Sequence, residues 1–260
     1  MEDRGYASIA VTRDRAVVTL TLNNPARKNA MGPAMVNELL WALDDAKDDP
    51  SVRAVVITGA GEAFCAGGDL KQMSGGEGPK LEQKGGYADL LLRFTTLGKP
   101  TVARVNGVAM GGGLGLVASC DFAIAGASAT FGTPEIKRGL FPMMIMAVLA
   151  RVVSRRHLLE MMLLGEKLDA ARAEAIELVH RAVPDSELDA AVAELTARLA
   201  KQSPTAMRLG LAAFHAQADM RLAEALPWLE QRLFEILGTE DAREGLEAFV
   251  ERRDPEWTGR

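Results

Sequence analysis

The chain has 260 residues, of which 48% are hydrophobic and 25% charged, proportions that are typical of a folded globular protein and unlike a disordered one. Thirty Lys and Arg stand against thirty-five Asp and Glu, and the net charge of −5 with scattered basic residues argues against nucleic acid as a partner. At roughly 100 to 200 residues per domain, the length predicts one large domain or one domain with a smaller appendage.

The first 200 residues predict strands and helices in succession. Residues 7–23 alternate between apolar and polar side chains with a polar break at 13–15, which predicts two strands joined by a hairpin. Helical spacing of Met35, Leu39, Leu40 and Leu43 behind Pro33 predicts a first helix. Short β-branched or apolar runs predict three further strands, over Val52–Thr58, Thr101–Val105 and Asp121–Ala125. This order is typical of an α/β fold.

The last 60 residues have a different character. Three segments are helical in pattern and no strand is expected among them: Thr205–Ala218, Arg221–Leu237 and Thr239–Arg252. We therefore predict an α/β core over residues 1–200 and a helical region over residues 201–260. The Gly- and Lys-rich stretch Ser74–Gly86 has almost nothing to bury and is interpreted as a surface loop.

Two features bear on the compartment. Cys65 and Cys120 stand alone, without a CxxC pair, so neither a disulfide framework nor a zinc site is expected. The N-terminal residues lack the apolar stretch of a signal peptide. The longest apolar run, Leu140–Ala150, contains a proline and is far shorter than the roughly 20 residues that span a bilayer. We expect a soluble cytoplasmic protein without a membrane partner.

Two glycine-rich segments are the first candidates for a binding site. One is AFCAGGDLK, over Ala63–Lys71, and the other is NGVAMGGGLGLVASCD, over Asn106–Asp121. Gly111–Gly113 fall at the N-terminus of an expected helix, where free N–H groups can bind a phosphate or an oxyanion. A dinucleotide motif fails because position 116 is Leu, and no phosphate loop follows. The alternative is that these glycines only let a helix and a strand pack closely.

Several ordered motifs together resemble the crotonase superfamily, the enoyl-CoA hydratases and isomerases. They are NNPARKNAM, VRAVVITGAGEAFCAGGDLK, KPTVARVNGVAMGGGLGLVASCD, ATFGTPEIKRGLFP and DAREGLEAFVERR. The resemblance covers nearly the whole chain. It implies the crotonase (ClpP-like) fold of repeated ββα units with C-terminal helices. It also implies that the N–H groups of Gly68 and Gly112 form an oxyanion hole for a thioester carbonyl, where each donor contributes about 3 to 4 kcal/mol.

The carboxylates depart from the pattern of the family. Classical hydratases have two glutamates, one on the GGG helix and one in the later PE turn. Gly115 stands at the first position, whereas Glu135 is present at the second. Hydration divides its proton transfers between the two carboxylates, while a single one suffices to shift a double bond. The sequence therefore favours isomerisation of a 3-enoyl-CoA to a 2-enoyl-CoA over hydration, with Glu135 as the acid and base.

The remaining candidates are methionines, aspartates and histidines. Met143–Met146 replace the glycine-rich turn of many hydratases and either pack in the core or line a dry acyl pocket. Asp69 and Asp121 are expected to cap helices or bind nearby backbone and are left out of catalysis. The histidines, His157, His180 and His215, are expected at the surface.

The resemblance also implies residues that bind the carrier. Coenzyme A is expected as part of the substrate, with no separately bound cofactor and no metal. Arg27 or Lys28 would lie near the phosphates, and Phe249 and Arg252 would reach the ligand from the C-terminal end. Ala66, Gly68, Leu70 and Lys71 would flank the adenine and pantetheine. Family members form trimers, often paired into hexamers, so self-association through residues 201–260 is expected.

Two other classes of function stay open at this point. One is a non-catalytic acyl-CoA-binding protein that kept the oxyanion hole after losing a glutamate. The other is different thioester chemistry on the same scaffold, such as hydrolysis, dehalogenation or decarboxylation. The first two of these reactions want a nucleophile or base, and none can be located because Gly115 is inert and no histidine is well placed. A serine peptidase is disfavoured because no Ser-His pair is apparent.

Overall fold

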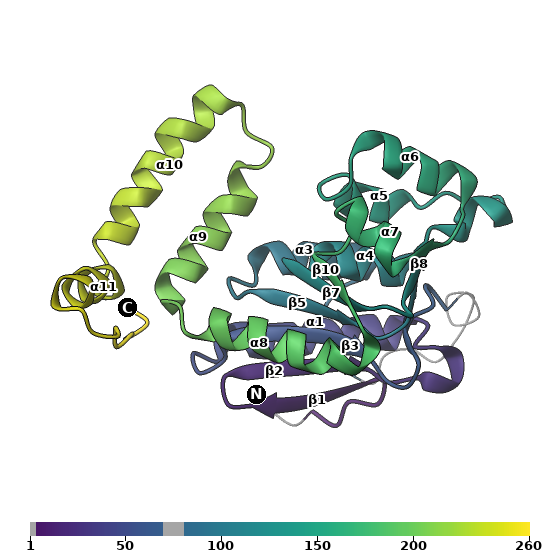
Figure 1. The fold of residues 1–260 in the computed structure, drawn as a ribbon, viewed down its shortest axis with the longest axis horizontal. Coiled ribbons are helices and arrows are strands. Elements are labelled where there is room, and N and C mark those ends of the chain that lie inside the picture. The colour runs from purple at the N-terminus through teal and green to yellow at the C-terminus, as the bar shows by residue number, and fades with distance from the viewer. Residues whose placement is uncertain (1–3, 70–80) are drawn as a thin grey trace.

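The computed structural model describes residues 4–69 and 81–260, and within them the chain forms two sheets flanked by helices (Figure 1). The strands are β1 (Ile9–Asp14), β2 (Val17–Leu22), β3 (Ala54–Gly59), β4 (Ala63–Cys65), β5 (Thr101–Val105), β6 (Val108–Met110), β7 (Phe122–Gly126), β8 (Thr130–Gly132), β9 (Leu168–Asp169) and β10 (Arg181–Val183). The helices are α1 (Pro33–Asp48), α3 (Tyr87–Thr96), α4 (Gly112–Ser119), α5 (Met143–Leu149), α6 (Arg155–Leu164), α7 (Ala170–Ala175), α8 (Leu188–Ala200), α9 (Pro204–Gln217), α10 (Leu222–Leu237) and α11 (Glu240–Glu251), with short 3-10 turns η1 (Pro25–Arg27), η2 (Pro134–Arg138) and η3 (Asp185–Glu187).

The larger sheet has the strand order β1-β2-β3-β5-β7-β10 and is parallel except for the β1–β2 hairpin. The predicted hairpin is confirmed, and its turn contains Arg15 at φ 52°. Both faces of this sheet are covered. Val55 and Ile57 of β3 belong to the main core, whereas Val56 between them packs against α8 residues on the other face. This alternation is the period of two expected of a strand.

The second sheet has the order β4-β6-β8-β9 and was not expected, because its strands have only two or three residues each. It is built from the second strand of successive units, β3-β4-α3 and β5-β6-α4, so the ββα repetition is confirmed. The three further predicted strands are also confirmed: β5 has the predicted bounds, β3 begins at Ala54 and β7 begins at Phe122. Residues 81–86 of the predicted surface loop form neither helix nor strand, and residues 74–80 lie outside the described part of the chain.

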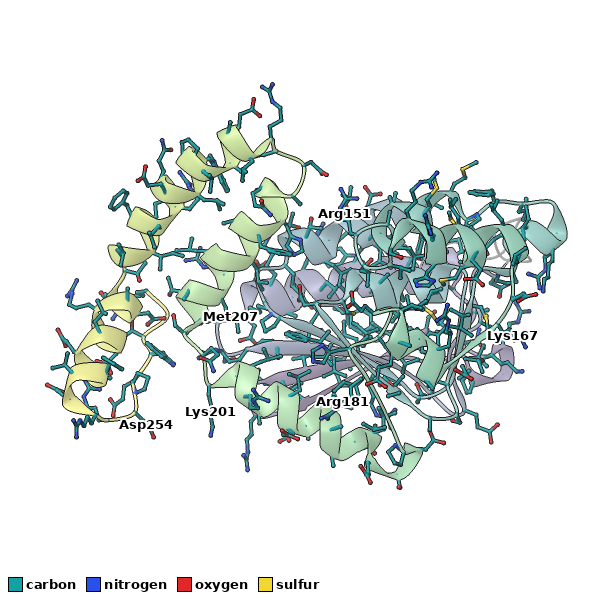
Figure 2. All side chains as sticks on the ribbon, turned by 45° about the horizontal axis from the view of Figure 1, so that its top comes forward. Arg151, Lys167, Arg181, Lys201, Met207 and Asp254 are labelled. Carbon is teal, nitrogen blue, oxygen red and sulfur yellow. The ribbon has the colours of Figure 1, made fainter. Side chains whose placement is uncertain are left out.

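The C-terminal helices α9, α10 and α11 extend away from the sheets (Figure 1). Figure 2 shows the same arm between Lys201 and Asp254, with Met207 on its first helix. Many large apolar side chains of the arm are exposed, as follows: Phe214, Leu222, Leu226, Leu233, Phe234, Leu237, Leu246, Phe249 and Val250. After β10 the described chain is helical, as the sequence predicted for residues 201–260.

Candidate functional site

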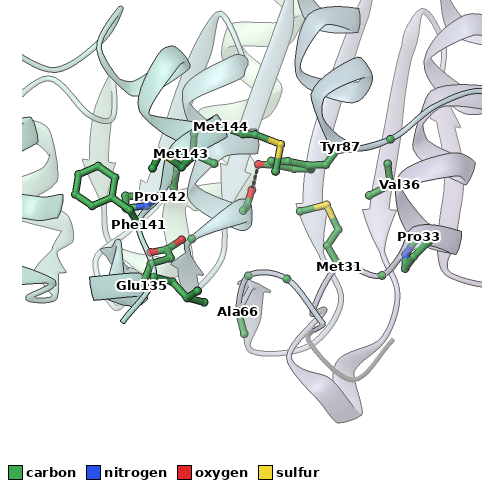
Figure 3. Close-up of a pocket in the computed structure, with 18 of the residues that line it drawn as sticks. Met31, Pro33, Val36, Ala66, Tyr87, Glu135, Phe141, Pro142, Met143 and Met144 are labelled. Atoms are coloured by element: carbon green, nitrogen blue, oxygen red, sulfur yellow. Dashed lines mark hydrogen bonds between the residues drawn. The ribbon is translucent and has the colours of Figure 1, made fainter. Parts of the chain in front are cut away.

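A largely apolar cavity of about 570 Å³ lies where both glycine segments meet η2, and Figure 3 shows its lining. The loop after β4 contributes Ala66–Gly68, and the start of α4 contributes Gly111 and Gly112. Glu135 enters from η2, and Met143–Ile145 from the start of α5. The cavity therefore collects elements from distant parts of the sequence around two glycine backbones.

The first backbone donor is Gly68. A short parallel bridge joins Met31 to Gly68: the Met31 N–H donates to the Gly67 carbonyl at 2.8 Å, and the Asp69 N–H donates to the Met31 carbonyl at 2.9 Å. In such a bridge the N–H of Gly68, between the two bonded residues, points away from Met31. Within the described part of the chain, the Gly68 N–H has no protein acceptor. Gly68 itself lines the cavity.

The second backbone donor is Gly112, the first residue of α4. An N–H in the first turn of a helix has no acceptor within that helix. Among residues 4–69 and 81–260, no backbone carbonyl accepts a hydrogen bond from the Gly112 N–H. The helix dipole adds positive potential at this end. Two N–H groups at one cavity can together bind an oxygen that carries negative charge.

The three positions of the GGG motif favour glycine for different structural reasons. Gly111 has φ +50°, and a Cβ there would lie 2.7 Å from Oε1 of Glu135. A Cβ on Gly113 would overlap the backbone carbonyl of Cys65, so this glycine lets α4 pack onto β4. At Gly112 the nearest atoms to a Cβ are 3.5 Å away, an ordinary contact. The close-packing interpretation therefore holds for Gly113, while Gly111 and Gly112 face the cavity.

Glu135 is the only carboxylate among the described residues that line the cavity. It lies in η2, which follows the buried Thr133. The Thr133 hydroxyl donates to the Met161 carbonyl at 2.7 Å and so fixes the start of this turn. Its Oε2 is buried and has no hydrogen-bond partner in the described structure. Burial raises the pKa of this carboxyl, and the opposing effects of its own N–H and of Arg138 are smaller. A desolvated carboxylate beside two free donors is suited to moving a proton.

The place of the missing glutamate is occupied. A Cβ on Gly115 would overlap the Tyr87 hydroxyl and would lie 2.5 Å from Cγ2 of Ile145. Tyr87 begins α3, and its hydroxyl donates to the Gly112 carbonyl at 2.5 Å (Figure 3). Burial raises the pKa of this phenol well above 10, with further contributions from Cys65 and Glu135. No sequence motif points to Tyr87, because none links the start of α3 to α4.

The predicted carrier-binding residues divide into four groups. Arg27 is half exposed and pairs with Asp69 at 2.5 Å, and the Lys28 carbonyl accepts the Ala66 N–H at 2.9 Å, so both lie beside the loop after β4. Ala66 lines the cavity. The predictions for Leu70 and Lys71 fall outside the described residues.

The fourth group, at the C-terminal end of the arm, lies outside the lining of the cavity. Phe249 is on α11 and is 83% exposed, and Arg252 caps that helix in a left-handed conformation. Neither lines the cavity. Their contact with a ligand stays a prediction.

The methionine run divides between the cavity and the core, and an acyl chain at the cavity stays a prediction. Met143 and Met144 line the cavity and are more than half exposed, whereas Met146 packs against the main core. No histidine lines the cavity. Within residues 4–69 and 81–260, no cluster of three or more His, Cys, Asp or Glu side chains could hold a metal ion. In the same residues, no helix is long and apolar enough to cross a membrane.

Asp69 and Asp121 bind nearby groups. Asp121 accepts the Thr101 N–H and hydroxyl, each at 2.7 Å, and lies 3.9 Å from Nε2 of His215. Asp69 is buried against Arg27. Neither aspartate lines the cavity.

Paired strand layers built from ββα units, with a cavity at two glycine backbones, define a protein with the crotonase fold. The family model for "Enoyl-CoA hydratase/isomerase" matches residues 12–260. The chain belongs to this family.

Named relatives agree with this assignment. A protein of Mycobacterium tuberculosis named "Probable enoyl-CoA hydratase echA8" is 37% identical over 98% of this chain and 99% of its own. The "Mevalonyl-coenzyme A hydratase sidH" of Aspergillus fumigatus is 34% identical over 93% of this chain and 91% of its own. The solved enoyl-CoA hydratase of Bacillus anthracis superimposes with a TM-score of 0.90 at 30% identity, covering 98% of this chain and 100% of that one.

Proposed function

We propose that this protein binds an enoyl-CoA thioester with its carbonyl oxygen between the N–H groups of Gly68 and Gly112, and that Glu135 moves a proton at the adjacent carbon. The observation that carries the proposal is the unpartnered, buried Oε2 of Glu135 in the cavity that Gly68 and Gly112 line. Removing a proton next to a thioester gives an enolate, whose charge develops on the carbonyl oxygen. Donors fixed in advance stabilise that charge without reorganising.

The reaction follows from how the proton returns. A proton that Glu135 takes from the α-carbon of a 3-enoyl-CoA and delivers to the γ-carbon gives the 2-enoyl isomer. The single carboxylate in the described lining supports this outcome. The relatives named hydratases support the second candidate, addition of water across the 2-enoyl bond. Both reactions need the same carbonyl site and the same carboxylate.

The carrier is proposed to leave the cavity along the loop after β4. Arg27 and Lys28 lie beside this loop and would meet the phosphates of coenzyme A, and Ala66, Gly68, Leu70 and Lys71 would flank its adenine and pantetheine. The guanidinium of Arg27 is about half exposed, so it can approach a phosphate while it remains near Asp69. We propose no other cofactor.

Self-association is proposed through the C-terminal arm. Exposed apolar side chains gather on this arm, as is typical of a protein-protein contact, and Phe249 and Arg252 lie on the arm outside the cavity of their own chain. A homotrimer or hexamer would satisfy both observations. A cytoplasmic location is also proposed, supported by the two unpaired cysteines, Cys65 and Cys120.

The test compares Glu135→Gln with Glu166→Gln, an exposed glutamate outside the cavity. Each protein is given 3-enoyl-CoA and 2-enoyl-CoA, and the products are separated by chromatography. We expect Glu135→Gln to lose 10²- to 10⁴-fold in rate while still binding the thioester, as removal of a general acid–base group does, and Glu166→Gln to match the original protein. Unchanged turnover in Glu135→Gln would refute the proposal. Binding without turnover in the original protein would favour a non-catalytic acyl-CoA binder.

A further inference from the structure

A phenol hydroxyl stands where the sequence lacks a carboxylate. Gly115 leaves the first turns of α4 without a polar side chain toward the cavity, but Tyr87 reaches the same place from α3. A Cβ built on Gly115 would overlap Oη of Tyr87, so this oxygen lies at the root of the side chain that a glutamate would have there. A side chain from another part of the sequence therefore occupies this space.

The orientation of this hydroxyl is fixed. Its single proton is donated to the Gly112 carbonyl at 2.5 Å, so the lone pairs of the oxygen remain as acceptors. The start of α3, which carries Tyr87, is fixed by the Asp89 carboxylate, which accepts the Gly86 N–H at 2.7 Å. Because burial keeps the pKa of the phenol well above 10, it stays protonated and serves as a neutral acceptor.

Tyr87 and Glu135 flank the same pair of glycines. Oη of Tyr87 lies 3.6 Å from the Cβ position of Gly112, and Oε1 of Glu135 lies 2.7 Å from the Cβ position of Gly111. In Figure 3 the ring of Tyr87 and the carboxylate of Glu135 enter the cavity from different sides. The two oxygen acceptors therefore lie next to neighbouring residues at the start of α4, and both side chains line the same cavity.

We propose that Tyr87 is a catalytic residue that holds the attacking water against Glu135, so that the protein hydrates a 2-enoyl-CoA with one carboxylate and one phenol. This inference rests on the proposed carbonyl site and on the proposed role of Glu135. Water donates one hydrogen bond to Oη of Tyr87 and the other to the carboxylate of Glu135. Its oxygen is then directed at the β-carbon of a thioester whose carbonyl is held at Gly112.

The steps balance with these groups alone. The water oxygen forms a bond to the β-carbon while Glu135 takes one of its protons, and the electrons of the carbon–carbon double bond move to the thioester oxygen as an enolate. Glu135 then returns this proton to the α-carbon and regenerates its carboxylate. The net reaction adds one water to the enoyl-CoA and gives a 3-hydroxyacyl-CoA. Tyr87 keeps its proton throughout.

Two assays separate Tyr87 from Glu135. Hydration of crotonyl-CoA is followed by the loss of enoyl-thioester absorbance. Exchange of the α-protons of butyryl-CoA in D₂O is followed by mass spectrometry, and it needs Glu135 and the carbonyl site but no attack by water. The variant is Tyr87→Phe, and the matched control is Tyr6→Phe, the other tyrosine of the chain, whose hydroxyl faces Asp45 outside the cavity.

We expect Tyr87→Phe to slow hydration about 10- to 100-fold while α-proton exchange stays within roughly threefold, since only the water loses a partner. Tyr6→Phe should leave both rates unchanged. Loss of the bond from Tyr87 to Gly112 would, by itself, disturb the carbonyl site and slow both reactions equally, and that result would overturn the inference. Undiminished hydration in Tyr87→Phe, or isomerisation without any hydration by the original protein, would overturn it as well. If Glu135→Gln leaves exchange intact, the proposed function itself fails.

Discussion

Substitution of Gly111 by alanine should affect stability and activity through two separate contacts. Gly111 has φ +50° and ψ −122°, a conformation that is essentially confined to glycine, and such strain costs about 1–3 kcal/mol. For a chain of this size, 2 kcal/mol corresponds to a fall in Tm of roughly 4 to 8 °C. The new methyl group would also stand 2.7 Å from Oε1 of Glu135 and push this carboxylate aside. A displacement of about 1 Å costs on the order of 100-fold in rate.

The matched control is Gly61→Ala. Gly61 also has positive φ, +68°, but a Cβ there would meet only Cβ of Pro25 at 3.4 Å, and Gly61 lies outside the cavity. Thermal unfolding and turnover of enoyl-CoA are measured for both variants. We expect both to lose stability and only Gly111→Ala to lose about 100-fold or more in kcat. Equal turnover in the two variants would refute the assigned contact between Gly111 and Glu135.

Three further predictions follow from charge and exposure. The value of kcat/KM should fall as the pH drops through the raised pKa of Glu135, because the carboxylate is the base; a flat acid limb in the pH–rate profile would contradict this. The folded state binds a proton at Glu135 more readily than the unfolded state, so stability falls as the pH rises through the folded pKa. Glu135→Gln should therefore have a higher Tm than the original protein at neutral pH. The difference should disappear below about pH 4.3, where the carboxyl of the unfolded chain is also protonated. A lower Tm for Glu135→Gln at about pH 7 would contradict this prediction. Finally, Phe234→Glu on the exposed face of α10 should shift the assembly toward smaller species, whereas Leu163→Glu on α6 should not. The measurement is size-exclusion chromatography with light scattering. A monomeric original protein would contradict the proposed association.

Much of the fold could be predicted because its signals are local. The β1–β2 hairpin, α1 behind Pro33 and strand β5 follow from alternation and helical spacing within single segments. The short strands β4, β6, β8 and β9 could not be found in this way. A segment of two or three residues has too few side chains for a period, and its pairing is decided by the neighbouring strand.

The candidate site divides in the same manner. The two glycine segments could be predicted from the chemistry of helix termini, and Glu135 from the resemblance of its motif to the family's. Tyr87 was not identifiable, since its importance depends on its contact with Gly112, which is 25 residues away on another helix. The resemblance implied that Gly115 stands where the family has a carboxylate. The packing of α3 against α4, which no local pattern could predict, places the Tyr87 hydroxyl beside Gly115.

The central claim is that backbone N–H groups polarise the thioester carbonyl, and Gly112→Pro tests it directly. Gly112 is the first residue of α4, where proline is tolerated, so the substitution removes the N–H donor with little cost to the helix. The measurement is the infrared stretching frequency of butyryl-CoA labelled with ¹³C at the carbonyl. We predict a lower frequency on the protein than in water, and a return toward the free value on Gly112→Pro. A bound frequency equal to the free one, or a shift that persists fully in Gly112→Pro, would contradict the account.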